Sequence, residues 1–263
     1  MMKKNAVISF SGGLDSTSLL LHLIKKQYKV YALSFNYGQK HKIEIDKALL
    51  NIEYLRSKNF KIDYKILNIS DALSIFNSSL TNKYEDIPSG YYKEENMKST
   101  VVPNRNAIFA SFAYAHAISI NKNKALETKI GLGVHSGDHA IYPDCRLEFY
   151  QKLFDAFKTG NWDTDNIGAY LPYLKFSKAD ILKDALKSCN QLEIDFHEIF
   201  KNTLTSYAPD ENGISSGETA SDVERILAFN EIGMIDPIPY QKSWEKVLEN
   251  ALKSEKKYKN IEK

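Results

Sequence analysis

Residues 10–17 have the composition, and the place in the chain, of a phosphate-binding loop. They read FSGGLDST and lie between a short apolar run and a segment with helical periodicity. Gly12 and Gly13 allow backbone N–H groups to approach an anion closely, and the N-terminus of the following helix adds a favourable dipole. The sequence contains no GxxxxGK[ST] pattern, which argues against a loop that cleaves the γ-phosphate of a nucleotide.

Side chains in this loop could hold the phosphates of a nucleotide together with a metal ion. The hydroxyls of Ser11, Ser16 and Thr17 can donate hydrogen bonds to phosphate oxygens. Asp15 would repel a bare phosphate, so we expect it to hold a Mg²⁺ ion that bridges the phosphates. The alternative is a glycine-rich turn in which Asp15 only caps the helix. The combination of glycines, hydroxyls and a carboxylate at this spacing favours the phosphate loop.

The elements that must position this loop alternate between strands and helices. Apolar runs of strand length predict strands, and helical periodicity predicts helices. The order β-α-β-α-β in the first part of the chain predicts an α/β, Rossmann-like fold, a parallel sheet with helices on both faces. Ser177 with Asp180 resembles a capping box at a helix start. The predicted strands are 6–10, 30–35, 62–67 and 129–134, and the predicted helices are 19–24, 43–55, 106–120, 181–186 and 221–229.

Three stretches interrupt this alternation. Residues 77–100 are polar and contain Pro88 and Gly90, and a loop of this length inside a domain predicts a functional lid. The chain becomes irregular after Thr203. We therefore expect a main domain over 1–200 and a small, irregular and helical C-terminal appendage over 201–263 that packs with it as one unit. From Lys253 the tail is rich in lysine, and we expect it to be frayed.

Composition limits the classes of protein that this chain can represent. The 263 residues carry a net charge of only +2, so charge alone does not predict binding to nucleic acid. No apolar run is long enough to cross a bilayer, and the N-terminus makes a poor signal peptide. The two cysteines, Cys145 and Cys189, have no spacing typical of a disulfide framework. We expect a cytoplasmic protein with reduced thiols and no membrane partner.

Four segments together carry a resemblance to a known family. The loop 10–17 resembles the SGGxDS pyrophosphate loop of the N-type ATP pyrophosphatases, the PP-loop superfamily, which cleave ATP between the α- and β-phosphates. Further matches are FNYGQKHKIE at 35–44, VPNRN at 102–106, and Asp138 followed by IYPDCRLEF at 141–149. In this order and at these separations they resemble the QueC family, the 7-cyano-7-deazaguanine synthases, over about residues 6–240.

The resemblance implies a reaction and a substrate. In that family ATP adenylates the carboxylate of 7-carboxy-7-deazaguanine, ammonia converts the adenylate to an amide, and a second ATP turns the amide into a nitrile. The cofactors it implies are ATP and Mg²⁺, and the family's habit implies a homodimer.

The substrate also suggests which residues recognise its base. A guanine-like edge presents N1–H and N2–H₂ donors, which a carboxylate can accept in a bidentate manner. Asp144 or Asp138 could provide that carboxylate. Tyr142 or Tyr37 could stack on the base. Gln39, in the same segment as Tyr37, is expected to contact the substrate.

The carboxylate that reacts, and the oxyanion that develops from it, need fixed cations. Arg105, Arg146 or Lys40 could provide them, although a surface ion pair is the alternative for Arg146. For His41, packing at a helix start is as good an explanation as a role in the site. With Asp15 on the metal, we expect Asp15, Lys40 and Arg105 to act in catalysis.

The chain departs from the family in one region. Family members usually carry four zinc-binding cysteines near the C-terminus, and those places are taken here by Ser206, Ser216, Thr219 and Asp222. Hydroxyls are poor substitutes for thiolates on Zn²⁺. We therefore expect no zinc, and hydrogen bonds in its place, since the nearby Arg225 of the family pattern remains. The loss of these cysteines indicates a divergent branch.

Three functions are compatible with these features. The first is a synthase that uses ammonia, in queuosine-type biosynthesis. The second is a ligase that joins the activated deazaguanine to the N-terminal amine of a protein, as in QueC-like proteins associated with antiviral defence. The missing cysteines give a slight preference to the second. The third, an inactive nucleotide- or base-binding partner, is disfavoured because Asp15, Arg105 and Asp144 are present.

Overall fold

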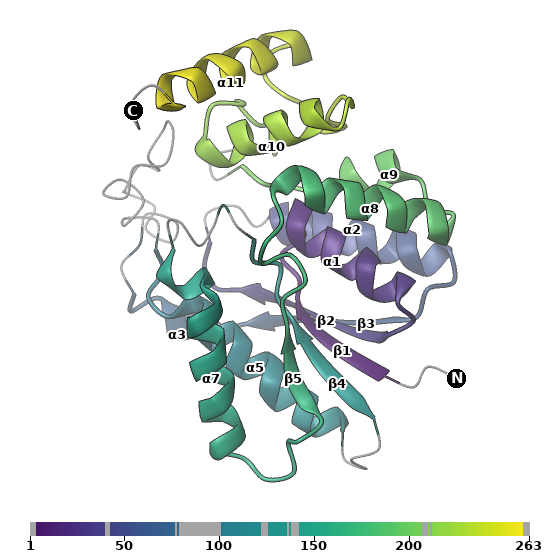
Figure 1. Ribbon diagram of the computed structural model, residues 1–263, viewed down its shortest axis with the longest axis vertical. Coiled ribbons are helices and arrows are strands. Elements are labelled where there is room, and N and C mark those ends of the chain that lie inside the picture. Colours follow the sequence, from purple (N-terminus) through teal and green to yellow (C-terminus); the bar gives the residue numbers. More distant parts are fainter. Residues whose placement is uncertain are drawn as a thin grey trace.

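A parallel sheet with helices on both faces forms the centre of the protein (Figure 1). The computed structural model describes residues 4–39, 43–76, 78, 101–121, 126–135, 137, 142–206, 210 and 212–259. Within them, five strands pair in the order β3-β2-β1-β4-β5, and every pairing is parallel. The predicted α/β, Rossmann-like class is confirmed. The strands are β1 Lys4–Ser9, β2 Lys29–Asn36, β3 Ile62–Asn68, β4 Glu127–Gly131 and β5 Ile167–Tyr170.

Side chains along the central strands alternate between the two faces of the sheet, and a layer of helices covers each face. On β1, Ala6 and Ile8 join the core on one face, whereas Val7 joins the core on the other. Successive side chains of a strand point to opposite faces, so a strand buried on both sides is apolar throughout. One face is covered by α1 Leu14–Lys25, α2 Ile43–Ser57, α8 Lys178–Leu192 and α9 Phe196–Phe200, and the other by α5 Arg105–Ile120 and α7 Leu147–Thr159 (Figure 1).

Local sequence signals predicted most of these elements. The capping box of Ser177 and Asp180 is present at the start of α8, with the Asp180 backbone nitrogen donating to Ser177 Oγ at 3.1 Å. Strand β5 was missed because it is only four residues long and contains Gly168, and helix α7 was not predicted either. The remaining short elements are α3 Ser70–Leu73 and the 3₁₀ turn η1 Pro143–Cys145.

The C-terminal part consists of two longer helices at one end of the molecule, α10 Ala220–Glu231 and α11 Trp244–Lys259 (Figure 1). They share a small apolar core of Val223, Ile226, Val247 and Ala251. The expectation of a frayed tail from Lys253 is wrong, because α11 continues to Lys259. Glu249 pairs with Lys246 and with Lys253 on successive turns, and such pairs stabilise an exposed helix. The domain boundary near residue 200 stays a prediction.

Arg225 on α10 connects this part to the main body. Its side chain is fully buried, and it pairs with Asp236 through Nε–Oδ2 at 2.6 Å and Nη2–Oδ1 at 2.8 Å. Its Nη1 donates to Thr203 Oγ1 at 2.8 Å and to Thr205 Oγ1 at 2.9 Å. Arg225 therefore fixes the segment after α9 against α10. Within the residues described, no helix is long and apolar enough to cross a membrane.

We predict that Asp236→Asn destabilises the protein strongly. The change keeps the shape of the side chain but leaves the buried guanidinium without a countercharge, which costs about 3–5 kcal/mol. The exposed pair between Lys242 and Glu218, at 2.6 Å, offers a matched control, and Glu218→Gln should cost less than about 1 kcal/mol. Urea unfolding measures both. Equal losses would show that Arg225 does not anchor the C-terminal part.

Candidate active site

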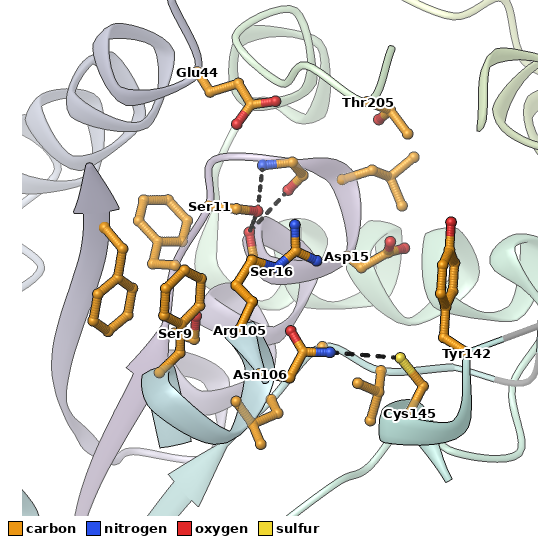
Figure 2. A pocket seen from close by; sticks show the side chains of 18 of the residues that line it. Ser9, Ser11, Asp15, Ser16, Glu44, Arg105, Asn106, Tyr142, Cys145 and Thr205 are labelled. Atoms are coloured by element: carbon orange, nitrogen blue, oxygen red, sulfur yellow. Dashed lines mark hydrogen bonds between the residues drawn. The ribbon is translucent and has the colours of Figure 1, made fainter. Parts of the chain in front are cut away.

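A cavity of about 280 Å³ opens where the loops after β1, β2 and β4 meet (Figure 2). The chain passes from β1 to β2 and β3 on one side and later returns to β4 on the other, so the strand order reverses between β1 and β4. Open parallel sheets bind ligands at such a switch point, beyond the carboxyl ends of the strands. The sheet topology therefore places the cavity where an α/β protein binds small molecules.

In the turn after β1, only glycine fits at position 12. Gly12 has φ +81°, and a Cβ there would lie 2.8 Å from Ala48 Cβ and 2.8 Å from the backbone oxygen of Glu44. Gly13 follows as the residue that precedes α1. Its backbone nitrogen donates to Ser11 Oγ at 3.2 Å, and its oxygen accepts from Ser16 Oγ at 3.2 Å (Figure 2). The two serine hydroxyls lie 3.1 Å apart, so both are at the N-terminus of α1.

The predicted phosphate-loop residues divide into two groups. Ser11, Gly13, Asp15 and Ser16 line the cavity. Gly12 and Thr17 are not among the lining residues. Thr17 is fully buried in α1, and its Oγ1 has no hydrogen bond to a described residue. Gly12 therefore shapes the loop, and the predicted bond from Thr17 to phosphate has no support from its position.

Asp15 suits a magnesium ion that is shared with phosphates. Its Oδ1 is buried and has no hydrogen-bond partner among the described residues. Mg²⁺ is usually held by one or two carboxylates together with substrate phosphates. The described part of the chain has no cluster of three or more His, Cys, Asp or Glu that could hold a metal alone. A magnesium ion that arrives with a nucleotide fits this single carboxylate.

The sequence did not predict three charged or titratable residues in the cluster around Asp15, namely His135, Lys178 and Glu224. Lys178 Nζ lies 3.3 Å from Asp15 Oδ2 and 3.0 Å from Glu224 Oε2. His135 Nε2 lies 3.9 Å from Asp15 Oδ2. Lys178 is the first residue of α8, where a cation is disfavoured by the helix dipole. That unfavourable position, directly after the capping Ser177, is the signal that could have indicated a lysine with an anionic partner.

The second wall of the cavity comes from α5 and the loop after β2. Arg105 is the first residue of α5, and its Nη1 donates to the Tyr37 hydroxyl at 3.4 Å. Its guanidinium carbon lies 5.7 Å from the centre of the Tyr37 ring. Gln39 also lines the cavity, but its amide accepts from the Tyr37 backbone nitrogen and donates to the Phe35 oxygen, at 2.9 and 3.2 Å. Gln39 therefore holds the loop that presents Tyr37.

The third wall comes from the segment around η1. Tyr142, Asp144 and Cys145 line the cavity, and Asn106 Nδ2 lies 3.8 Å from Cys145 Sγ (Figure 2). Arg146 is exposed and is not among the lining residues. The predicted roles of Lys40, His41 and Asp138, and the predicted lid at 77–100 apart from Ser78, lie outside the residues that the structure describes.

Three of the four residues that replace the zinc cysteines form a hydrogen-bonded cluster. Asp222 Oδ2 accepts from Ser206 Oγ at 3.1 Å and from Thr219 Oγ1 at 2.7 Å. Ser216 Oγ instead accepts locally from the Glu218 backbone nitrogen at 3.2 Å. With both hydroxyls committed to one buried carboxylate, this donor set does not suit Zn²⁺. The absence of zinc stays a prediction.

Glu44 brings a further carboxyl to the cavity, opposite Tyr142 (Figure 2). Burial raises the pKa of Glu44 to about 7, although the positive charge of Arg105 opposes the shift. Close to neutral pH this carboxyl is therefore partly protonated. A protonated Glu44 would not repel phosphates at the adjacent loop, and it could exchange a proton with a bound substrate.

Comparison with known proteins identifies one family. A family model described as "Queuosine biosynthesis protein QueC" matches residues 5–233. A 7-cyano-7-deazaguanine synthase 1 from Colwellia psychrerythraea is 40% identical over 91% of this chain and 100% of its own length. Proteins named 7-cyano-7-deazaguanine synthase from Marinomonas sp. and Methanoregula boonei are 41% and 40% identical, over 91% and 90% of this chain and 100% and 99% of their own lengths.

We predict that Glu44 makes the free energy of unfolding depend on pH. Because its pKa in the folded state lies above its usual value of about 4.5, the folded state holds the proton more tightly. The stabilisation is present below about pH 4.5 and is lost as the pH rises to about 7, at no more than about 1.4 kcal/mol per pH unit. Glu44→Gln should remove this loss, whereas the control Glu53→Gln, exposed on the same helix, should not. Urea unfolding at pH 5, 6, 7 and 8 measures the difference. A gap between Glu44→Gln and the unmodified protein that does not grow with pH would contradict the assignment.

Proposed function

The chain belongs to the QueC family, and from that premise we propose that it is an ATP-dependent carbon–nitrogen ligase that adenylates the carboxylate of 7-carboxy-7-deazaguanine. The acceptor we propose is ammonia, with 7-cyano-7-deazaguanine as the product. One observation carries this most strongly: relatives named for that product match about nine-tenths of this chain and essentially all of their own length.

The phosphate end of the cavity suits the nucleotide. Ser11 and Ser16 offer hydroxyls, and the backbone at Gly13 offers the N-terminal dipole of α1. Lys178 adds an ammonium beside the loop, where it can neutralise the charge that develops on the leaving pyrophosphate. A magnesium ion on Asp15 would add a second positive charge across the phosphates.

The opposite end of the cavity suits a purine-like base. We propose that Asp144 accepts the N–H donors of the guanine edge and that Tyr142 stacks on the ring, since both line the wall formed by η1. Arg105 lies between this wall and the phosphate loop, and its guanidinium can hold the carboxylate that reacts (Figure 2). The base end and the phosphate end are then bridged by one cation.

The chemistry needs little beyond positioning and proton transfer. A carboxylate oxygen attacks the α-phosphorus of ATP, and pyrophosphate leaves. Ammonia then attacks the acyl carbon, AMP leaves with the electron pair of the broken C–O bond, and the nitrogen loses a proton. Nitrile formation repeats the adenylation on the amide oxygen and again releases N–H protons. Glu44 has a pKa of about 7, which suits the acceptance of such protons at neutral pH.

Conjugation to the N-terminus of a protein, which the missing cysteines slightly favour, is the second candidate. Its supporting observation is the replacement of the zinc cysteines, which could free one wall of the cavity to change shape. However, Ser206, Thr219 and Asp222 are joined by hydrogen bonds, and Thr205 is held by Arg225. A wall held in this way favours a small acceptor. A homodimer is proposed only from the family resemblance.

The acceptor can be determined by mass spectrometry. The purified protein is incubated with ATP and 7-carboxy-7-deazaguanine, and either ammonium chloride or purified proteins encoded beside its gene are added. We expect 7-cyano-7-deazaguanine with ammonium, and AMP with pyrophosphate as the nucleotide products. Asp15→Asn serves as the inactive control. A deazaguanine-sized mass on a neighbouring protein, without nitrile formation, would replace ammonia with a protein amine as acceptor, and ADP as the product would contradict adenylation.

A further inference from the structure

Glu224 is the one carboxylate from α10 that reaches the phosphate end of the cavity. Its Oε2 lies 3.0 Å from Lys178 Nζ, closer than Asp15 Oδ2 at 3.3 Å. Its Oε1 lies 3.8 Å from His135 Nδ1. Four elements thus meet at one point: α1, the loop after β4, α8 and α10.

Two features around this cluster position Glu224. The neighbouring Arg225 is fully buried and paired with Asp236, which fixes this turn of α10. On the other side, a Cβ at Gly137 would lie 2.6 Å from Glu224 Oε1. The Gly137 backbone nitrogen donates to His135 Nδ1 at 3.1 Å, and His135 Nε2 lies 3.9 Å from Asp15 Oδ2. The absence of a side chain at Gly137 therefore leaves room for the Glu224 carboxylate beside Lys178.

Lys178 pairs with two carboxylates, and this affects how well Asp15 can bind a metal ion. An ammonium that paired with Asp15 alone would compete with a metal ion for the same oxygens, because both are cations. Here Glu224 lies closer to the ammonium, and Asp15 keeps one buried oxygen, Oδ1, without a hydrogen bond to a described residue. A second carboxylate on Lys178 weakens its ion pair with Asp15 and therefore makes Asp15 a better partner for magnesium.

We propose that Glu224 is a positioning residue that shares Lys178 with Asp15, weakens the ion pair between Lys178 and Asp15, and thereby keeps Asp15 available for the magnesium ion of magnesium–ATP. The proposal rests on the proposed function, since it assumes that ATP binds at the phosphate loop. It also gives the C-terminal part a role in the reaction, because Glu224 is positioned by α10 and not by the sheet.

The test measures ATP binding by calorimetry at several MgCl₂ concentrations, without 7-carboxy-7-deazaguanine and so without turnover. With Glu224→Gln, we expect the magnesium concentration for half-maximal ATP binding to rise about 5- to 10-fold. ATP affinity without magnesium should be unchanged or tighter, because the variant removes a negative charge near the phosphates. Glu224→Asp, with a shorter reach toward Lys178, should fall between. Glu231→Gln, which removes a charge from the same helix at its exposed end, is the matched control and should have no effect.

A double-mutant cycle separates positioning from a simple charge effect. If Glu224 acts through Lys178, Glu224→Gln should not change the magnesium dependence further in a Lys178→Gln protein. The same shift in both backgrounds would overturn the proposal, as would an unchanged magnesium dependence in a folded Glu224→Gln protein. If the unmodified protein failed to bind ATP even with magnesium, the proposed function would fail instead. Thermal melting of each variant confirms that it is folded.

Discussion

The turn at Gly12 is the constraint on which the rest of the site depends. Its positive φ and its direct contact with α2 leave no room for a side chain, so the chain must leave β1 and enter α1 at one angle. That angle aims the N-terminus of α1 into the space beyond the carboxyl ends of the strands. Ser11 then reaches the cavity from the loop, and Asp15 and Ser16 reach it from the first turn of α1. Helix α2, which packs against the turn, brings Glu44 to the same cavity.

Charge balance is the second feature that shapes the cavity. Asp15, Glu44, Asp144 and Glu224 face a space that must also accept the phosphates of a nucleotide. The fold reduces this repulsion in two ways. Glu44 is partly neutral, because burial raises its pKa to about 7, and Glu224 and Asp15 share the ammonium of Lys178. Arg105, placed by the start of α5, supplies a further positive charge near the middle of the cavity.

The sequence predicted the features that local patterns encode. These features are the phosphate loop, the first four strands and the capping box at Ser177. Each depends on residues that are close to one another in the sequence. Cavity residues were found where a motif carried them, as for Arg105, Tyr142 and Asp144. Lys178 and Glu224 were not found, because Lys178 meets Asp15, and Glu224 meets Lys178, only through folding of residues that are far apart in the sequence. Thr17 was placed on phosphate because its hydroxyl is adjacent to Ser16 in sequence, yet a helix turns it into the core. The sequence predicted that hydrogen bonds replace the zinc site. Only the structure shows that Asp222 is the acceptor at its centre.

We propose that the substrate carboxylate attacks the α-phosphorus of ATP. Isotope transfer tests it most directly. When 7-carboxy-7-deazaguanine carries ¹⁸O in both carboxylate oxygens, attack at the α-phosphorus and later displacement of the adenylate must leave a carboxylate oxygen on AMP. Mass spectrometry of the AMP formed with ammonium present should therefore find a single ¹⁸O atom in each AMP from the first adenylation and none in pyrophosphate. Unlabelled AMP, or label in released phosphate, would contradict adenylation of the carboxylate and with it the proposed function.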